Sequence, residues 1–194
     1  MRWPTPVMTA VFAIGMLLTG PGFGHSNPAF AGGPYKGRVV DSETGRPLEG
    51  AVVLAVWNLN VPVIVDTVDV FLDAEEVLTD GNGRFAVGRH TPRSLKPGKV
   101  EGPYLTIYYP GYGFYPMNHV SPPIPTFGGT DEVLKRMDKE EVIFELPRLK
   151  TREDRIRVQG CVFEHNVPDD KMPNLLRLLN LERKRLGLAP THTN

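Results

Sequence analysis

The chain has little of the chemistry that most directly indicates a function. It has 194 residues but a single cysteine, so no disulfide can form within one chain and no cysteine-rich zinc site is available. Its 22 basic residues are balanced by 22 acidic ones, which removes the basic excess typical of nucleic-acid-binding proteins. It has no Gly-x-Ser-x-Gly nucleophile motif and no phosphate-binding loop. The motifs therefore favour neither an enzyme nor a nucleic-acid-binding protein.

One apolar run lies at the N-terminus, and no second run approaches membrane length. Arg2 precedes the uncharged run Val7–Leu18, and Ala29 and Ala31 place small residues at the −3 and −1 positions of a cleavage point. A membrane-spanning helix needs about 20 apolar residues, which is more than this run offers. We therefore expect a signal peptide over residues 1–31, cleaved after Ala31, and a secreted or periplasmic protein. The alternative is an uncleaved N-terminal anchor.

Glycine and proline are abundant, with 20 and 19 residues, which favours turns and short strands over a helical bundle. Apolar and β-branched segments between these turns predict strands. They are Tyr35–Asp41, Gly50–Trp57, Glu76–Thr79, Arg84–Val87, Tyr104–Tyr109 and Glu141–Leu146. The turn Asp80–Gly83 predicts a hairpin. Because no helical pattern separates the early strands, we expect a mainly β fold, an antiparallel β-sandwich.

Three longer segments do not fit a minimal sandwich. Asn58–Asp73 lies where a short loop is expected, and we interpret it as an insertion. Residues 114–139 are proline-rich before Thr130, which begins a predicted short helix through Met137. Pro173–Leu186 is a predicted helix with leucines on one side and basic residues near its end. Long insertions on a rigid scaffold often carry function.

The order of several short motifs resembles that of a known family. The motifs are Gly37–Asp41, Thr44–Leu48, Gly50–Val53, Thr79-Asp80 followed by Gly83–Phe85, and Pro110–Tyr112. Together they resemble the carboxypeptidase regulatory-like domain, here over residues 35–147. The resemblance implies a transthyretin-like, Greek-key sandwich that acts as a non-catalytic binding or interaction module of secreted and cell-envelope proteins. Residues 148–194 form a basic C-terminal extension that the resemblance does not cover.

Charge is unevenly distributed along the chain. Pro47–Gly83 contains seven acidic and no basic residues, whereas residues 148–194 contain ten basic and six acidic ones. The acidic segment and the basic tail either face each other, within one chain or across a dimer, or are solvated separately. Calcium binding is a further alternative, although Asp66, Asp69 and Asp73 lack the spacing and the glycine of a calcium loop.

Tyrosines in the segment 104–115 are the candidate ligand-binding residues. Strand alternation places Leu105 and Ile107 on the core face and Tyr104 and Tyr108 on the other. An outward ring pair, with Tyr112 nearby, would allow a sugar or peptide to stack. The alternative is that these rings cover an insertion loop.

The remaining reactive side chains are scattered. His90, His119 and Tyr112 are the only candidates for a metal-dependent hydrolase or oxygenase on the same sandwich. Cys161 is expected to be buried in a late strand or to pair between chains. We expect the terminal helix to pack on the sandwich or on a partner, with peripheral membrane contact as the alternative. We therefore predict a non-enzymatic module with no cofactor or metal, whose partner is an envelope protein or a carbohydrate.

Overall fold

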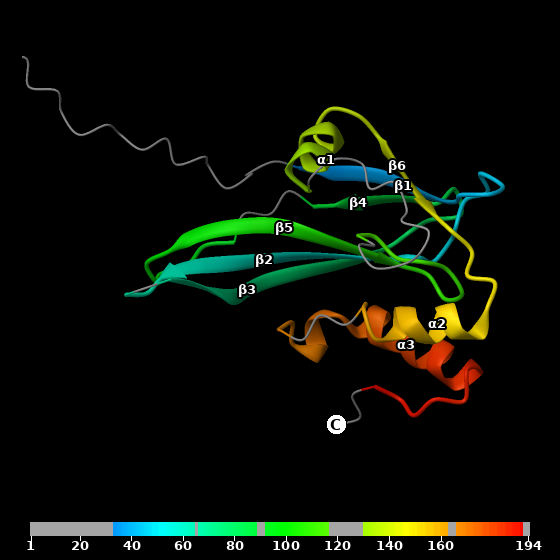
Figure 1. Ribbon diagram of the computed structural model, residues 1–194. Helices are drawn as coiled ribbons and strands as arrows, with labels where there is room; N and C mark the ends of the chain where they lie inside the picture. Colours follow the sequence, from blue (N-terminus) through cyan, green and yellow to red (C-terminus); the bar gives the residue numbers. More distant parts are fainter. Residues whose placement is uncertain (1–32, 65, 89–91, 117–129, 163–165, 192–194) are drawn as a thin grey trace, which may run out of the picture.

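The chain folds into two β-sheets and a layer of C-terminal helices (Figure 1). The computed structural model describes residues 33–64, 66–88, 92–116, 130–162 and 166–191. The strands are β1 (Tyr35–Asp41), β2 (Val52–Pro62), β3 (Thr67–Leu78), β4 (Arg84–Val87), β5 (Lys99–Tyr108) and β6 (Val142–Leu146). The helices are α1 (Thr130–Met137), α2 (Arg152–Gln159), a 3₁₀ turn η1 (Asp169–Lys171) and α3 (Pro173–Arg185). No helix in these residues is long and apolar enough to cross a membrane.

The six strands divide equally between two sheets. In the sheet that we call the short sheet, β1 lies between β4 and β6, and in the long sheet β2 lies between β3 and β5. The long sheet is antiparallel throughout, whereas β1 is antiparallel to β4 and parallel to β6. The predicted mainly β sandwich is confirmed, but purely antiparallel pairing is wrong. A parallel pair needs a long crossover connection, and the chain between β1 and β6 provides one.

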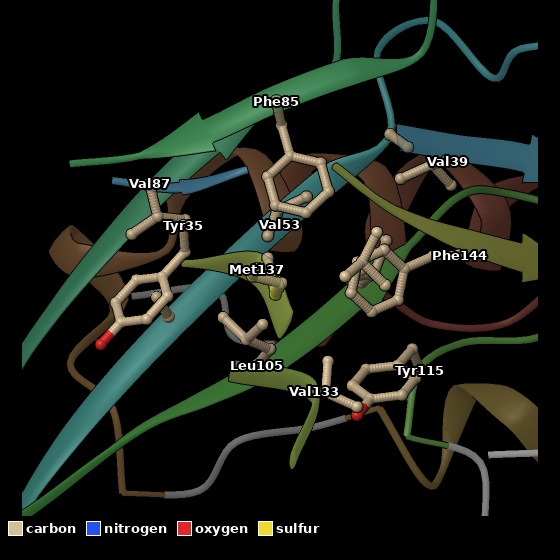
Figure 2. Close-up of a cluster of buried hydrophobic side chains, with 14 of the residues drawn as sticks. Tyr35, Val39, Val53, Phe85, Val87, Leu105, Tyr115, Val133, Met137 and Phe144 are labelled. Atoms are coloured by element: carbon tan, nitrogen blue, oxygen red, sulfur yellow. The ribbon is translucent and has the colours of Figure 1, made fainter. Parts of the chain in front are cut away.

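One hydrophobic core fills the space between the two sheets (Figure 2). Phe144 from β6 lies at its centre, with ring centroids 5.8 Å from Phe85 and 5.1 Å from Tyr115. A Cβ atom at Gly37 would lie 2.6 Å from Phe85 and 2.8 Å from Phe144, so only glycine lets these two rings meet over β1. Helix α1 adds Val133, Leu134 and Met137 to the same core.

A second hydrophobic cluster joins the helices to the outer face of the long sheet, away from the short sheet (Figure 1). β2 is buried on both faces, because Val52, Leu54 and Val56 point away from the sandwich core. Helices α2 and α3 cover them with leucine and valine side chains, namely Val158, Leu175, Leu178 and Leu179. The predicted helices 130–137 and 173–186 are thus confirmed, and the second one packs on the sandwich.

The segment Asn58–Asp73 differs most from its prediction. It is not a loop: β2 and β3 continue through it as a long antiparallel pair, from Pro62 opposite Thr67, and Val63 N–H donates to the Asp66 carbonyl beyond them. The cause is visible in the alternation of polar and apolar residues along Asn58–Pro62, which is a strand pattern. The other predicted strands all overlap observed ones.

The turn Asp80–Gly83 does not close a hairpin. It is tight, since Asp80 Oδ1 accepts hydrogen bonds from the N–H groups of Asn82 and Arg84 at 2.9 and 2.8 Å. However, the Gly83 carbonyl accepts a 2.7 Å hydrogen bond from Val39 N–H, which directs the following strand to β1. β3 and β4 therefore belong to different sheets.

The predicted late strand around Cys161 is also wrong. Thr151 caps helix α2 by accepting a 3.1 Å hydrogen bond from Asp154 N–H, and the helix runs to Gln159. Val158 and Val162 are four residues apart and both are buried, which places Cys161 on the exposed side of the turn that follows.

Candidate functional site

The long sheet extends past the parts of the protein that cover it. Its strands have 10 to 12 residues, whereas those of the short sheet have 4 to 7. At about 3.3 Å per residue, a difference of five residues corresponds to roughly 15 Å of strand. Figure 1 shows that one end of β2, β3 and β5 reaches beyond both the short sheet and the C-terminal helices. We call residues 58–73 and 99–103 the projecting sheet end.

Two irregularities mark the base of the projecting sheet end. The β2–β3 register shifts between Trp57 and Asn58, and the β2–β5 register shifts between Val56 and Asn58. Gly102 makes the second shift possible, since its φ is 113° and a Cβ atom there would lie 2.6 Å from the Val56 carbonyl oxygen. Such bulges bend a sheet and increase its twist. They therefore separate the projecting end from the covered part of the same strands.

The two faces of the projecting sheet end differ in chemistry. On the face that continues the sandwich core, Val70 pairs with Leu59 and Val68 pairs with Val61. Val68 and Val70 are 49% and 40% exposed, and Ile64 at the tip is fully exposed. On the opposite face, Asn60 donates a 2.9 Å hydrogen bond to Asp69. The apolar face is accessible on β3, whereas Leu59 of β2 is only 2% exposed and lies close to Gly98. On the opposite face Asn60 lies in register between Asp69 and Lys99, so that face is polar.

The acidic residues at the base of the projecting sheet end and in the covered part of β3 have partners within the protein. The Glu76 carboxylate accepts hydrogen bonds from Asn174 and Leu175 N–H at 2.8 and 2.6 Å, at the start of α3. Glu75 accepts one from Gly88 N–H. Asp73 forms a 2.9 Å ion pair with Lys171, which raises the pKa of that lysine. The predicted meeting of the acidic segment with the basic tail within one chain is seen in the Asp73–Lys171 pair, whereas Glu75 and Glu76 accept from backbone N–H groups.

The acidic residues of the hairpin tip are different. Asp66 accepts a hydrogen bond from Thr67 N–H, and Asp69 accepts one from the Asn60 amide. Among the residues that the structure describes, neither carboxylate forms an ion pair, and no three carboxylate, imidazole or thiol groups converge on a possible metal position. Among the described residues, the carboxylates of Asp66 and Asp69 therefore have no ion-pair partner at the exposed end of the sheet.

The three candidate tyrosines do not form one surface. Tyr104 is 41% exposed, and its hydroxyl donates to Glu101. Tyr108 does not stand outward beside it, because the C-terminal helices cover this part of the face; its buried hydroxyl accepts a 2.9 Å hydrogen bond from Gln159. Burial raises the pKa of Tyr108. The exposed ring pair predicted for Tyr104 and Tyr108 is therefore wrong.

Tyr112 is buried in a polar contact that joins three segments of the chain. Its hydroxyl donates to Asp41 Oδ2 at 2.9 Å and accepts from Arg148 at the same distance. Burial by itself raises the pKa of Asp41, but hydrogen bonds from Tyr112 and from Glu43 and Thr44 N–H outweigh it and hold that pKa below its usual value. Because the Tyr112 hydroxyl both donates and accepts a hydrogen bond within the protein, its role here is structural. His90 and His119, its predicted partners in an enzymatic alternative, lie outside the described residues.

A buried ion pair fastens the helices to each other. Glu182 on α3 is 1% exposed and accepts a 2.6 Å hydrogen bond from Arg155 on α2. Sequence analysis missed this pair and the Glu76 contact, since both join residues far apart in the chain. The projecting sheet end was likewise not predicted, although Val68 and Val70 alternate with polar Thr67 and Asp69 as in a strand.

Comparison with known proteins finds no counterpart for this chain. No family model, no curated protein and no solved structure matches it. The function has to be inferred from the geometry described above.

Proposed function

We propose that this protein is a non-catalytic interaction module, exported from the cytoplasm, that binds a partner protein of the cell envelope through its projecting sheet end. The observation that carries the proposal is the exposed apolar face formed by Val68, Val70 and Ile64 at that end. Grouped exposed apolar residues mark interaction sites more often than single ones do. In the rest of the long sheet most apolar side chains belong to the two hydrophobic clusters, so the tip differs from it.

The resemblance of residues 35–147 to carboxypeptidase regulatory-like domains is part of this proposal, as is a transthyretin-like, Greek-key arrangement. The chain crosses between the sheets at each of the connections β1–β2, β3–β4, β4–β5 and β5–β6, which supports such an arrangement. The N-terminal pattern supports export and cleavage after Ala31. Sequencing the N-terminus of the protein from its source cells should find Gly32 first, and an intact Met1 would contradict export by this route.

The interaction is tested by placing a photoreactive amino acid at the tip. We expect Ile64 replaced by benzoylphenylalanine to yield a discrete crosslinked protein in envelope extracts of the source cells. The same replacement at Ile143, which is 46% exposed on β6, is the matched control and should yield none. Replacing Val68 and Val70 together by threonine should abolish the adduct from position 64. Equal adducts from positions 64 and 143, or none from either, would contradict the proposal.

A further inference from the structure

We propose that the outer edge of β3 in the projecting sheet end, over Thr67–Asp73, pairs with an extended segment of the partner in which basic and apolar residues alternate. This inference rests on the proposed function, because it names how that surface binds and what it selects. The binding mode is addition of a strand to an open sheet edge.

Among the described residues the outer edge of β3 pairs with no strand, whereas the edge of β5 is covered at Ile107, outside the projecting sheet end. Within the described residues, β2 is the only strand that pairs with β3. At the other edge, Ile107 of β5 exchanges two hydrogen bonds with Tyr115, at 2.9 and 3.0 Å. An edge strand presents a row of N–H and C=O groups that can pair with another chain, and natural edges are usually kept short. β3 has 12 residues, so its edge is long.

The side chains along this edge specify an alternating partner. Val68 and Val70 lie on one face of β3, and Asp69 lies between them on the other. A strand added alongside β3 places its own residues alternately beside the two valines and beside Asp69. Opposite charges on neighbouring strands of one face attract each other, and like charges there are destabilising.

The charge of the edge favours a basic partner over a second copy of this protein. Residues 47–83, which include the whole of β3, contain no lysine or arginine. Pairing two copies of β3 would bring acidic residues together with no basic residue on either strand to compensate. A partner with lysine or arginine at alternate positions instead meets the Asp69 carboxylate, which has no ion-pair partner within the part of the chain that the structure describes.

The test uses a capped, fluorescent peptide of about eight residues, the length of an ordinary strand, in which lysine and valine alternate. Binding to the purified protein is measured by fluorescence anisotropy. One control peptide has the same composition with all lysines before all valines, and another alternates glutamate and valine. Asp69→Lys is compared with Glu145→Lys, which makes the same change at an exposed position on the edge strand β6. Asp69→Asn keeps the side-chain shape, and circular dichroism checks that each variant folds.

We expect Asp69→Lys to weaken binding of the alternating lysine peptide about tenfold or more, and to strengthen binding of the glutamate peptide. Asp69→Asn should have an intermediate effect, and Glu145→Lys should change affinity less than about twofold. Hydrogen exchange should slow at amides of residues 67–73 and not at those of residues 142–146 when the lysine peptide is bound.

Three outcomes would overturn the edge-pairing inference. They are equal binding of the block peptide, an equal loss in Glu145→Lys, and unchanged exchange at residues 67–73. If the crosslink from position 64 persists in any of these cases, the proposed function stands and the partner binds the apolar face in another way. If the crosslink also fails, both proposals fall.

Discussion

The two halves of the long sheet use the same three strands in opposite ways. In the covered half, β2 has valine and leucine side chains buried on both faces, between the short sheet and the C-terminal helices. In the projecting half, neither the short sheet nor the helices cover the sheet end (Figure 1), although Leu59 of β2 stays buried beside Gly98, and the paired β3 residues Thr67–Val70 are all exposed. Strand pairing therefore continues where layer packing has stopped. The comparison separates residues that hold the fold together from residues that are available to a partner.

The largest expected effect lies in β2 at Trp57, beside the register shift that marks the base of the projecting sheet end. Trp57 is 2% exposed and packs in the sandwich core. Trp57→Ala should lower the free energy of unfolding by about 3–5 kcal/mol, because a large buried side chain leaves a cavity. Urea unfolding measures the change, and Val68→Ala in the projecting half is the control, with an effect below about 0.5 kcal/mol. Similar losses of unfolding free energy in Trp57→Ala and Val68→Ala would contradict the distinction between the two halves.

The pH dependence of the unfolding free energy provides a second test of the covered half. Asp41→Asn should cost about 1.5–3 kcal/mol at neutral pH, since it weakens hydrogen bonds to a charged, buried group. The folded-state pKa of Asp41 is lowered, so its contribution is fully present above the unfolded pKa of about 4 and is lost as the pH falls through the folded value. The stability difference between wild type and Asp41→Asn should therefore shrink in acid. A difference that stays constant below pH 4 would show that the charge of Asp41 is not responsible.

A smaller effect is expected where β3 meets α3. Glu76→Ala removes the acceptor for two N–H groups at the start of α3 and should cost about 1–2 kcal/mol, similar to the loss of a helix cap. Glu76→Gln keeps an acceptor oxygen but loses the negative charge near the helix N-terminus, so it should cost less. Urea unfolding of both variants measures the order. An equal cost for the two would mean that charge, not hydrogen bonding, dominates the contact.

The smallest effect on stability is expected in the projecting half, at positions 68 and 70. Replacing both valines by threonine keeps two β-branched side chains at exposed positions, so the free energy of unfolding should change by less than about 0.5 kcal/mol. Thermal unfolding checks this, and the crosslink from position 64 reports binding in the same variant. A large loss of stability would place these valines in the fold rather than in an interface.

Local signals predicted most of the fold, and long-range contacts account for what they missed. Gly and Pro turns located most strands, and the leucine spacing of Pro173–Leu186 located α3. Whether a turn joins strands of one sheet or of two depends on a third partner, as the bond from Val39 to Gly83 shows. The sequence could not show which face of β2 packs against the helices, because both faces of this strand are apolar. Tyr108 was placed outside for the same reason: strand alternation does not reveal a second covering layer.

The support that Glu76 gives to α3 also bears on how the chain can be divided. Residues 174 and 175 lie nearly a hundred positions after the carboxylate that receives their N–H groups. A shortened chain that stops at residue 147 would leave Val52, Leu54 and Val56 facing water, together with an unpartnered acid on β3. The C-terminal helices are thus as much a part of the folding unit as the strands. Expression of the sandwich alone should give a poorly soluble protein that aggregates.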